Sequence, residues 1–234
     1  MAGVKLDLVR ELASGLESLL FPSACRACGA DLAGARLICR RCRDYLTAPL
    51  PETWRRRCDL GEEAVGRWAR HPYEGPAGEA LRLLKFGGKR RMAALLAAGL
   101  APLVQVLKAA TGVEAAVPVP LHPARRRERR FNQSEDIGRR VATAVGIEFK
   151  PRGLARLKYT RPQVELDGEA RRANVRGAFA AREDFSGRTV LVVDDVITTG
   201  ATVAECARVL CETGATTVVA VAVAGAGLTE ASEQ

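Results

Sequence analysis

Apolar residues recur in two patterns along most of the chain. Helical spacing predicts helices over residues 77–86, 91–110, 133–145 and 200–213. Short runs rich in β-branched residues predict strands over residues 114–119, 190–193 and 216–223. Strands that alternate with helices indicate a parallel sheet with crossover helices, so we expect an α/β fold from about residue 73.

The N-terminal part follows a different pattern. Leucines on one helical stripe predict a helix over residues 4–20, which Phe21-Pro22-Ser23 ends. A cysteine-rich stretch comes next. We therefore expect two parts: residues 1–60 with this helix and a cysteine module, and an α/β domain over residues 61–234.

Four cysteines occur as two Cys-x-x-Cys pairs. They are Cys25, Cys28, Cys39 and Cys42. Two such pairs can fold as knuckles that hold one tetrahedral Zn²⁺, and five nearby arginines would offset the charge of four thiolates. Because protein ligands fill all four positions, the predicted zinc site is structural. The alternatives are four unrelated core cysteines, or disulfides, which a cytosolic chain rarely keeps.

The other three cysteines have no partner at metal-binding spacing. Cys58 and Cys211 carry no further signal, whereas Cys206 lies on the apolar face of a predicted helix. Free cysteine behaves as a small apolar residue, so we expect Cys206 in the core.

Charge narrows the class of ligand. The chain has 234 residues and a formal charge of +9, with most of the excess supplied by arginine. The guanidinium group suits bidentate contact with phosphate, so the bias points to phosphorylated ligands or nucleic acid. A solvated basic surface would explain the same charge, and charge alone does not decide between them.

Membrane and secretion signals are weak in this sequence. Asp7, Arg10 and Glu11 interrupt the N-terminal segment, so no signal-peptide core forms. The most apolar run, residues 217–224, is far shorter than the roughly 20 residues of a membrane helix. We expect a soluble cytoplasmic protein without a membrane partner.

Residues 190–202 carry the most specific chemistry. Four apolar residues form a predicted buried strand that ends in Asp194 and Asp195, where open α/β sheets bind ligands. The segment Thr198-Thr-Gly-Ala-Thr202 then opens a helix with hydroxyl side chains, a glycine and free N–H groups, which together suit a phosphate. A ribose 5-phosphate would fit both halves.

This segment closely resembles the phosphoribosyl pyrophosphate motif of type I phosphoribosyltransferases. The resemblance implies that Asp194 and Asp195 are catalytic and meet the ribose hydroxyls, and that Mg²⁺ is bound with the pyrophosphate. It implies a 5-phosphate site made of Thr198, Thr199, Gly200, Ala201 and Thr202. Thr198 stands where hypoxanthine-salvage enzymes carry an acidic residue, which disfavours hypoxanthine or guanine as acceptor.

Residues 117–134 form a second motif beside the predicted sheet edge. Its prolines end a strand stiffly, and a loop from this edge could present Arg125, Arg129 and Arg130 to a pyrophosphate. A solvated face is the simpler explanation for any one of these arginines. His122 is expected to be a turn residue with a structural hydrogen bond, and Phe131-Asn-Gln133 to start the next helix.

The polar stretch over residues 156–177 is the third motif. Loops of this length are usually functional or disordered, and we favour a lid that excludes water from a reactive sugar centre. Its candidate ligand contacts are Thr160, Gln163, Arg171 and Asn174.

Together the three motifs resemble the ComF/GntX family, whose members join an N-terminal cysteine module to a phosphoribosyltransferase-like domain and are associated with DNA uptake. Tyr73-Glu-Gly75 and Lys85-Phe86 match the family's entry into that domain. Two positions depart from the family pattern. Cys58 alone stands where a second knuckle is common, and Arg130 replaces the usual glycine before Phe131.

The resemblance implies a phosphoribosyltransferase that transfers a phosphoribosyl group from phosphoribosyl pyrophosphate to a nitrogen nucleophile. The alternative is a non-catalytic accessory protein whose basic zinc module binds single-stranded DNA or a DNA-uptake ATPase. A third option is a sensor of phosphoribosyl pyrophosphate without turnover. The acceptor and a homo-oligomeric state stay open at this level.

Overall fold

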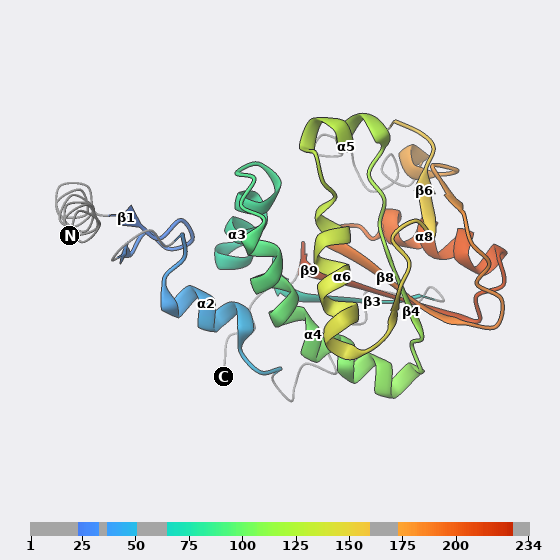
Figure 1. Cartoon of the computed structure of the whole chain (residues 1–234), viewed down its shortest axis with the longest axis horizontal. Helices are drawn as coiled ribbons and strands as arrows, with labels where there is room; N and C mark the ends of the chain where they lie inside the picture. Colours follow the sequence, from blue (N-terminus) through green and yellow to red (C-terminus); the bar gives the residue numbers. More distant parts are fainter. Residues whose placement is uncertain (1–22, 33–36, 51–64, 160–172, 227–234) are drawn as a thin grey trace, which may run out of the picture.

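A parallel sheet forms the centre of the molecule. The computed structural model describes residues 23–32, 37–50, 65–159 and 173–226. The sheet strands are β3 (Val65–Pro72), β4 (Ala115–Pro118), β5 (Glu148–Phe149), β8 (Thr189–Ile197) and β9 (Thr217–Gly225). They pair in parallel in the order β3-β9-β8-β4-β5 (Figure 1). The predicted α/β fold with a parallel sheet is confirmed.

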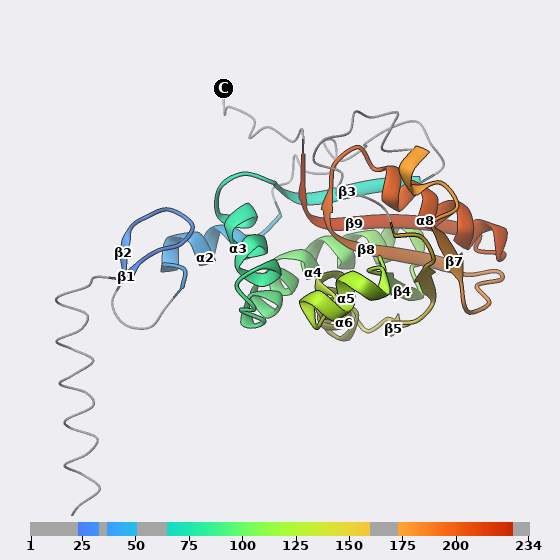
Figure 2. The same cartoon turned by 90° about the horizontal axis from the view of Figure 1, so that it is seen from above.

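Helices cover both faces of this sheet. They are α3 (Gly75–Lys85), α4 (Arg91–Thr111), α5 (Pro123–Arg129), α6 (Gln133–Val145) and α8 (Ala201–Glu212). Seen from above, α4 and α6 lie on one face and α8 on the other (Figure 2). The predicted ranges of four of these helices agree with the structure to within two residues, because their apolar spacing is helical.

Two short antiparallel pairs complete the described structure. In the N-terminal part, β1 (Ser23–Ala24) pairs with β2 (Asp31–Leu32), and α2 (Arg40–Thr47) follows. In the C-terminal half, β6 (Leu154–Arg156) pairs with β7 (Phe179–Ala181). The second pair frames the polar stretch that the sequence marks as a lid.

Strand β8 is longer than its apolar run. We expected the strand to end at Asp194, but it pairs with β9 as far as Ile197, opposite Gly225. Residues 190–193 are fully buried, and each buried valine or leucine contributes about 1.5–3 kcal/mol. The apolar run thus predicts the buried centre of β8, whereas the backbone ladder continues through both acids.

Strand β3 was missing from the sequence prediction. It contains Arg67, Arg70 and His71 and lies at the edge of the sheet, so it lacks the apolar run of a central strand. Arg70 and His71 are nevertheless buried. The α/β domain therefore begins its sheet at Val65 rather than near residue 73.

Arg70 and His71 join this edge to the N-terminal part. Arg70 Nη2 donates to the Ala48 carbonyl at 2.6 Å and its Nε donates to the Gly99 carbonyl at 3.2 Å. His71 Nε2 lies 3.3 Å from the Leu46 carbonyl, and burial lowers the pKa of His71 to about 4. A Cβ on Gly99 would lie 2.0 Å from the Leu46 carbonyl oxygen, so glycine permits α2 to approach α4 this closely.

Several N-terminal predictions fall outside the described residues. The helix over residues 4–20, Cys58 and the boundary between residues 60 and 61 all do so.

Helix α4 is the one helix in the described part that is long and apolar enough to cross a membrane. Its apolar side chains pack instead inside the protein, where Leu100, Leu103 and Val104 are almost fully buried in the core beneath the sheet. The most apolar run of the sequence, residues 217–224, forms most of β9.

The segment after His122 is helical, although we expected a loop. His122 Nδ1 accepts a hydrogen bond from the Ala124 N–H at 3.3 Å and so begins α5, which confirms its structural role. Pro123 is favoured at the first position of a helix, and this explains the helix. At its end Arg130 has φ of 63°, and it is the only residue other than glycine with positive φ in the described structure.

In this left-handed conformation glycine would be less strained than Arg130. An L-residue in the left-handed region is destabilised by about 1–2 kcal/mol. We expect Arg130→Gly to raise the free energy of unfolding by about 1 kcal/mol in urea denaturation. Arg127→Gly, inside α5, is the matched control and should lower it by up to about 1 kcal/mol. A destabilised Arg130→Gly would mean that side-chain contacts of Arg130 outweigh its backbone strain.

Candidate active site

Two adjacent acids lie in β8 near the carboxyl edge of the sheet. Asp194 is 9% exposed, and its Oδ1 accepts hydrogen bonds from Ser134 Oγ at 3.0 Å and from the Asp195 N–H at 2.8 Å. Burial, followed by the charge of Asp195, raises the pKa of Asp194 to about 7. Asp194 therefore changes its charge near neutral pH.

Asp195 has a cationic partner. Lys85 Nζ, at the end of α3, lies 2.6 Å from Asp195 Oδ2, and both side chains are largely buried. Burial is the largest single effect and lowers the pKa of Lys85, but the charge and hydrogen bond of Asp195 together with the charge of Asp194 raise the pKa overall. The two neighbouring acids thus have different electrostatic surroundings.

The segment Thr198–Thr202 follows the end of β8, with two residues between it and the acids. It lines a cavity of ≈30 Å³ together with Asp194, and Gly200 caps the N-terminus of α8 with φ of 77°. A Cβ on Gly200 would lie 1.9 Å from Arg67 Nη1, which also donates to the Thr199 carbonyl at 3.3 Å. The segment therefore combines the N-terminus of α8 with a close approach of the Arg67 guanidinium to Gly200, which only glycine allows. This geometry is suited to a phosphate.

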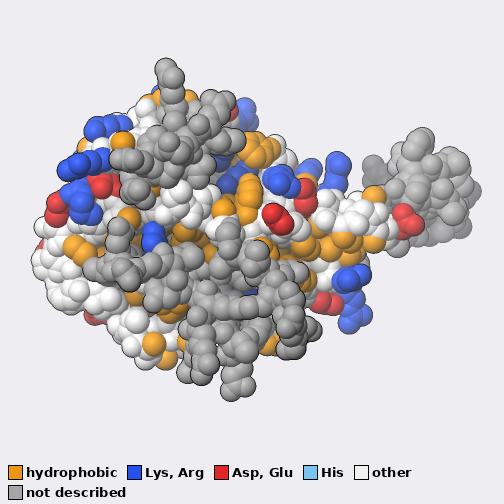
Figure 3. Space-filling view, turned by 180° about the vertical axis from the view of Figure 1, so that it is seen from behind, with side chains coloured by type: hydrophobic (Ala, Val, Ile, Leu, Met, Phe, Trp, Pro, Cys, Tyr) orange, Lys and Arg blue, Asp and Glu red, His pale blue; other side chains and the backbone are white. Residues whose placement is uncertain are grey.

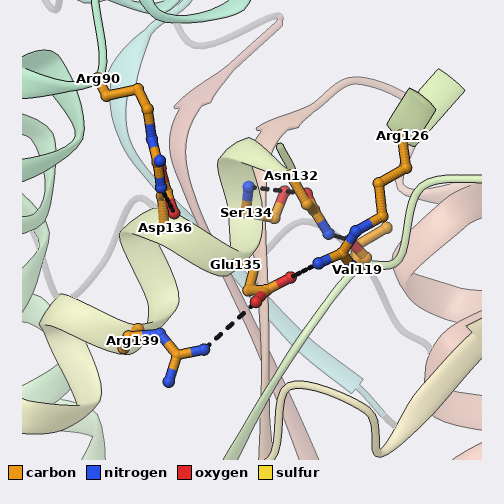
Figure 4. A network of polar contacts seen from close by, with 8 residues as sticks. All are labelled: Arg90, Val119, Arg126, Asn132, Ser134, Glu135, Asp136 and Arg139. Carbon is orange, nitrogen blue, oxygen red and sulfur yellow. Dashed lines mark hydrogen bonds and ion pairs between the residues drawn. The ribbon is translucent and has the colours of Figure 1, made fainter. Parts of the chain in front are cut away.

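The start of α6 holds Asp194 in place. Asn132 Oδ1 accepts from the Ser134 N–H at 3.1 Å, while its Nδ2 donates to the Val119 carbonyl at 3.0 Å (Figure 4). This cap ties α6 to the end of β4 and orients Ser134 towards Asp194. Gln133 Nε2 is buried and has no hydrogen-bond partner among the described residues, so a ligand atom or a water could satisfy it.

The first turn of α6 also carries two acids that bind arginines (Figure 4). Asp136 forms a bidentate pair with Arg90 at 2.8 and 2.9 Å, and Glu135 lies 3.0 Å from Arg126 on α5 and 3.3 Å from Arg139. These pairs fix α5 and the start of α4 against α6. The ion pairs thus hold in place the helices that surround the two acids of β8.

A large basic cavity lies between α5 and the β6–β7 pair. Its volume is ≈1050 Å³, and Glu183 is the one acid among the described residues that line it. The lining arginines are Arg126, Arg127, Arg130, Arg152, Arg156 and Arg182. Arg126 pairs with Glu135, whereas Arg127, Arg130, Arg152 and Arg182 form no ion pair within the described ranges, which suits the cavity to an anion.

The three predicted pyrophosphate contacts of the second motif lie in different surroundings. Arg130 lines the basic cavity, and Arg129 places its guanidinium 5.2 Å from the centre of the Phe86 ring. Arg125 is half-buried. Burial lowers the pKa of Arg156, and the nearby charge of Arg125 lowers it further. The fold brings them to one side of the site, and their role in binding stays a prediction.

The predicted lid lies mostly outside the described residues, including Thr160, Gln163 and Arg171. Asn174 is described and half-buried. Cys206 is fully buried on α8, as expected of a core cysteine.

Sequence reasoning missed three residues of this site. Lys85 and Ser134 lie within the segments that it singled out, but it gave them no role, and Arg67 lies in the strand that it overlooked. Of these three, Lys85 alone had a signal in the sequence, because Lys85-Phe86, like Tyr73-Glu-Gly75, matches the family's entry into the domain.

The four cysteines of the N-terminal part converge as predicted. Their Sγ atoms all lie within 4.8 Å of one another, with Cys25 and Cys42 3.9 Å apart and Cys28 and Cys39 3.6 Å apart. The backbone N–H groups of Cys39 and Cys42 point at the sulfurs of Cys25 and Cys39, at 3.3 and 3.4 Å. Such donors stabilise thiolates, so this cluster could hold a metal ion.

This chain is similar in sequence to a protein-family model and to several named proteins. Residues 91–233 match the family model described as a phosphoribosyl transferase domain. The DNA utilization protein YhgH of Salmonella typhimurium is 33% identical over 199 residues, which cover 84% of this chain and 81% of that protein. Competence protein F of Haemophilus influenzae is 35% identical over 104 residues, 43% of this chain and 45% of that protein.

Among solved structures, a purine phosphoribosyltransferase from Pyrococcus horikoshii aligns with 59% of this chain and 78% of its own length, at 14% identity and a TM-score of 0.35. The sequence matches identify the family without this weak likeness. The chain belongs to the phosphoribosyl transferase domain family, and its YhgH and competence protein F relatives and its four-cysteine cluster confirm the predicted ComF/GntX membership.

Proposed function

We propose that this protein binds phosphoribosyl pyrophosphate together with Mg²⁺ and transfers the phosphoribosyl group to a nitrogen nucleophile. The observation that carries the proposal is the acid pair of β8 followed by the turn Thr198–Thr202 at the N-terminus of α8. One half suits ribose hydroxyls and the other suits a phosphate.

Each half would act on a different part of the ligand. Asp194 and Asp195 would accept hydrogen bonds from the ribose 2- and 3-hydroxyls. Backbone N–H groups of the turn and the hydroxyls of Thr198, Thr199 and Thr202 would hold the 5-phosphate. The arginines of α5 would lie towards the pyrophosphate, where cations stabilise the leaving group.

The reaction itself needs little covalent chemistry from the protein. The nucleophile's nitrogen attacks the anomeric carbon, the bond from that carbon to the pyrophosphate oxygen breaks, and the nitrogen loses a proton to solvent or a base. Mg²⁺ would neutralise charge on the departing pyrophosphate. The two carboxyls would stabilise positive charge that develops on the sugar ring.

Two relatives suggest where this activity belongs. Their names connect them with DNA utilization and with competence. We propose that this chain shares that link, either as an enzyme of nucleoside metabolism after DNA uptake or as a component of the uptake process.

The four-cysteine cluster would hold one structural Zn²⁺. Four sulfurs at mutual distances within 4.8 Å leave no open position for a substrate. Its ligands Cys25 and Cys42 are buried in the same core cluster as α3 and α4, so the metal would also stabilise the docking of α2.

The basic cavity supports a second candidate, an accessory protein that binds single-stranded DNA. Lys and Arg side chains gather at the end of the molecule away from the four-cysteine cluster and again beside α2 (Figure 3). The cavity thus offers a surface in the larger domain, whereas the sequence pointed only to the zinc module. Phosphate contacts of this kind would make affinity depend steeply on salt.

The first prediction concerns the ligand. Calorimetry should show Mg²⁺-dependent binding of phosphoribosyl pyrophosphate to the wild type. Asp194→Asn and Asp195→Asn should each weaken binding by about 10- to 150-fold, because each removes a hydrogen bond to a charged group. Asp31→Asn, an exposed acid in β2, is the control and should bind normally. A wild type that binds no phosphoribosyl pyrophosphate would rule out the transferase proposal.

The second prediction concerns the metal. Purified protein should contain one zinc per chain by elemental analysis. Cys28→Ser should lose the metal and lower the Tm by about 5–10 °C, which corresponds to ~2–3 kcal/mol in a chain of this size. Cys211→Ser, also exposed but outside the cluster, should keep both the zinc and the Tm. Equal zinc content in the two variants would contradict the assignment.

The third prediction separates the two basic surfaces. In the triple variant Arg127→Ala, Arg152→Ala, Arg182→Ala, the salt slope of binding to a thymidine oligonucleotide should fall by about 2, since each phosphate contact contributes ~0.7. The comparison is Arg40→Ala, Arg41→Ala, Arg43→Ala on α2. An unchanged slope in the cavity variant would exclude this cavity as the DNA-binding surface.

A further inference from the structure

Lys85 ends helix α3 and directs its amine at the acid pair. Its Nζ lies 2.6 Å from Asp195 Oδ2, and the two side chains are only 15% and 14% exposed. Removing one partner of such a pair leaves a charge that is buried and uncompensated. Two other cations near the end of α3, Arg82 and Lys89, are exposed, so Lys85 differs from them in its surroundings.

Asp194 is held by two neutral donors, one from α6 and one from β8 itself. Ser134 Oγ on α6 and the backbone N–H of Asp195 both donate to its Oδ1. Each carboxyl of the pair therefore has its own partner, and only the partner of Asp195 carries a charge. Oδ1 of Asp195 accepts no hydrogen bond from the part of the chain that the structure describes, so it stays open to a ligand.

Other titratable groups face the pair or its lysine. Beyond Lys85 and Ser134, Arg156 on β6 and Cys206 on α8 interact with Asp194, whereas Tyr73 before α3 interacts with Lys85. Among them Lys85 alone is in contact with Asp195. Burial and then the charge of Asp195 raise the pKa of Asp194 to about 7, while Lys85 and Ser134 oppose the rise.

We propose that Lys85 is a positioning residue of the ligand site: its ammonium holds Oδ2 of Asp195 and so orients this side chain with Oδ1 open, while neutral donors alone hold Asp194. Asp195 then presents its open Oδ1 to one ribose hydroxyl. Asp194 becomes an acceptor for the second hydroxyl as it loses its proton. The effect on the ligand rests on the proposed function, whereas the charge arrangement does not.

The arrangement of charge can be tested without a ligand. Carbon-detected NMR of the Asp carboxyls, assigned with the two Asn variants, should show Asp194 titrating near neutral pH in the wild type. In Lys85→Met, the Asp194 titration should move up by about 1–3 pH units, because the charge of Lys85 lowers the pKa of Asp194. Lys85→Arg should restore the wild-type titration, and Lys89→Met should not alter it.

Binding of phosphoribosyl pyrophosphate with Mg²⁺ tests the consequence. At pH 7, Lys85→Met should bind at least about 10-fold more weakly than the wild type, and its affinity should recover at higher pH as the acid pair ionises. Lys85→Arg should keep the wild-type pH profile. A purely structural role would lower affinity equally at every pH.

Two results would overturn the inference: an Asp194 titration that Lys85→Met leaves unchanged, or a pH profile of binding that does not move. A wild type that fails to bind phosphoribosyl pyrophosphate would instead contradict the proposed function. In that case the carboxyl titrations alone would decide the role of Lys85.

Discussion

The burial of two adjacent carboxyls in β8 constrains the elements around them. A carboxylate removed from water without compensation is destabilised by several kcal/mol, and two neighbours repel each other as well. Asp194 obtains a hydroxyl from α6 and Asp195 obtains an ammonium from α3. Because Ser134 lies in the first turn of α6 and Lys85 in the last turn of α3, both helix ends must meet at the same place on the sheet edge. The crossover helices are thereby fixed in register as well as in direction.

A second level of contacts follows from the first turn of α6. Asn132 ties it to β4, while Glu135 and Asp136 pair with arginines of α5 and of the segment before α4. These exposed pairs contribute little energy singly, but they share one helical turn and restrict the same movement. They also neutralise only part of the positive charge nearby. Among the arginines around the large cavity, Arg126 alone takes part in these pairs, and the left-handed Arg130 is a position where charge replaces the conformational freedom of glycine.

The parts of this site that sequence could predict are those encoded locally. The buried run of β8, the acids and the turn into α8 follow one another within residues 190–202, and the paired cysteines lie within eighteen residues of one another. Contacts between distant segments were out of reach. Lys85 meets an acid more than a hundred positions away, and Arg67 lies in an edge strand whose charged residues hide its pattern. Helix α5 was mistaken for a loop because its arginines leave no apolar stripe, although Pro123 at its start favours a helix.

The N-terminal part and the acid pair are joined by continuous packing. Cys25, Cys42 and Leu46 belong to the same core cluster as Leu81 and Leu84 of α3, one turn and less from Lys85. Interiors at crystal-like packing density transmit displacement, so a change in α2 is felt by α3. Gly99 and the buried pair of Arg70 and His71 hold α2 close through backbone carbonyls, which tolerate little movement. The four-cysteine cluster therefore helps to support α3, whose last residue, Lys85, pairs with Asp195. This connection is physical, although the cysteines are far from the ligand site in sequence.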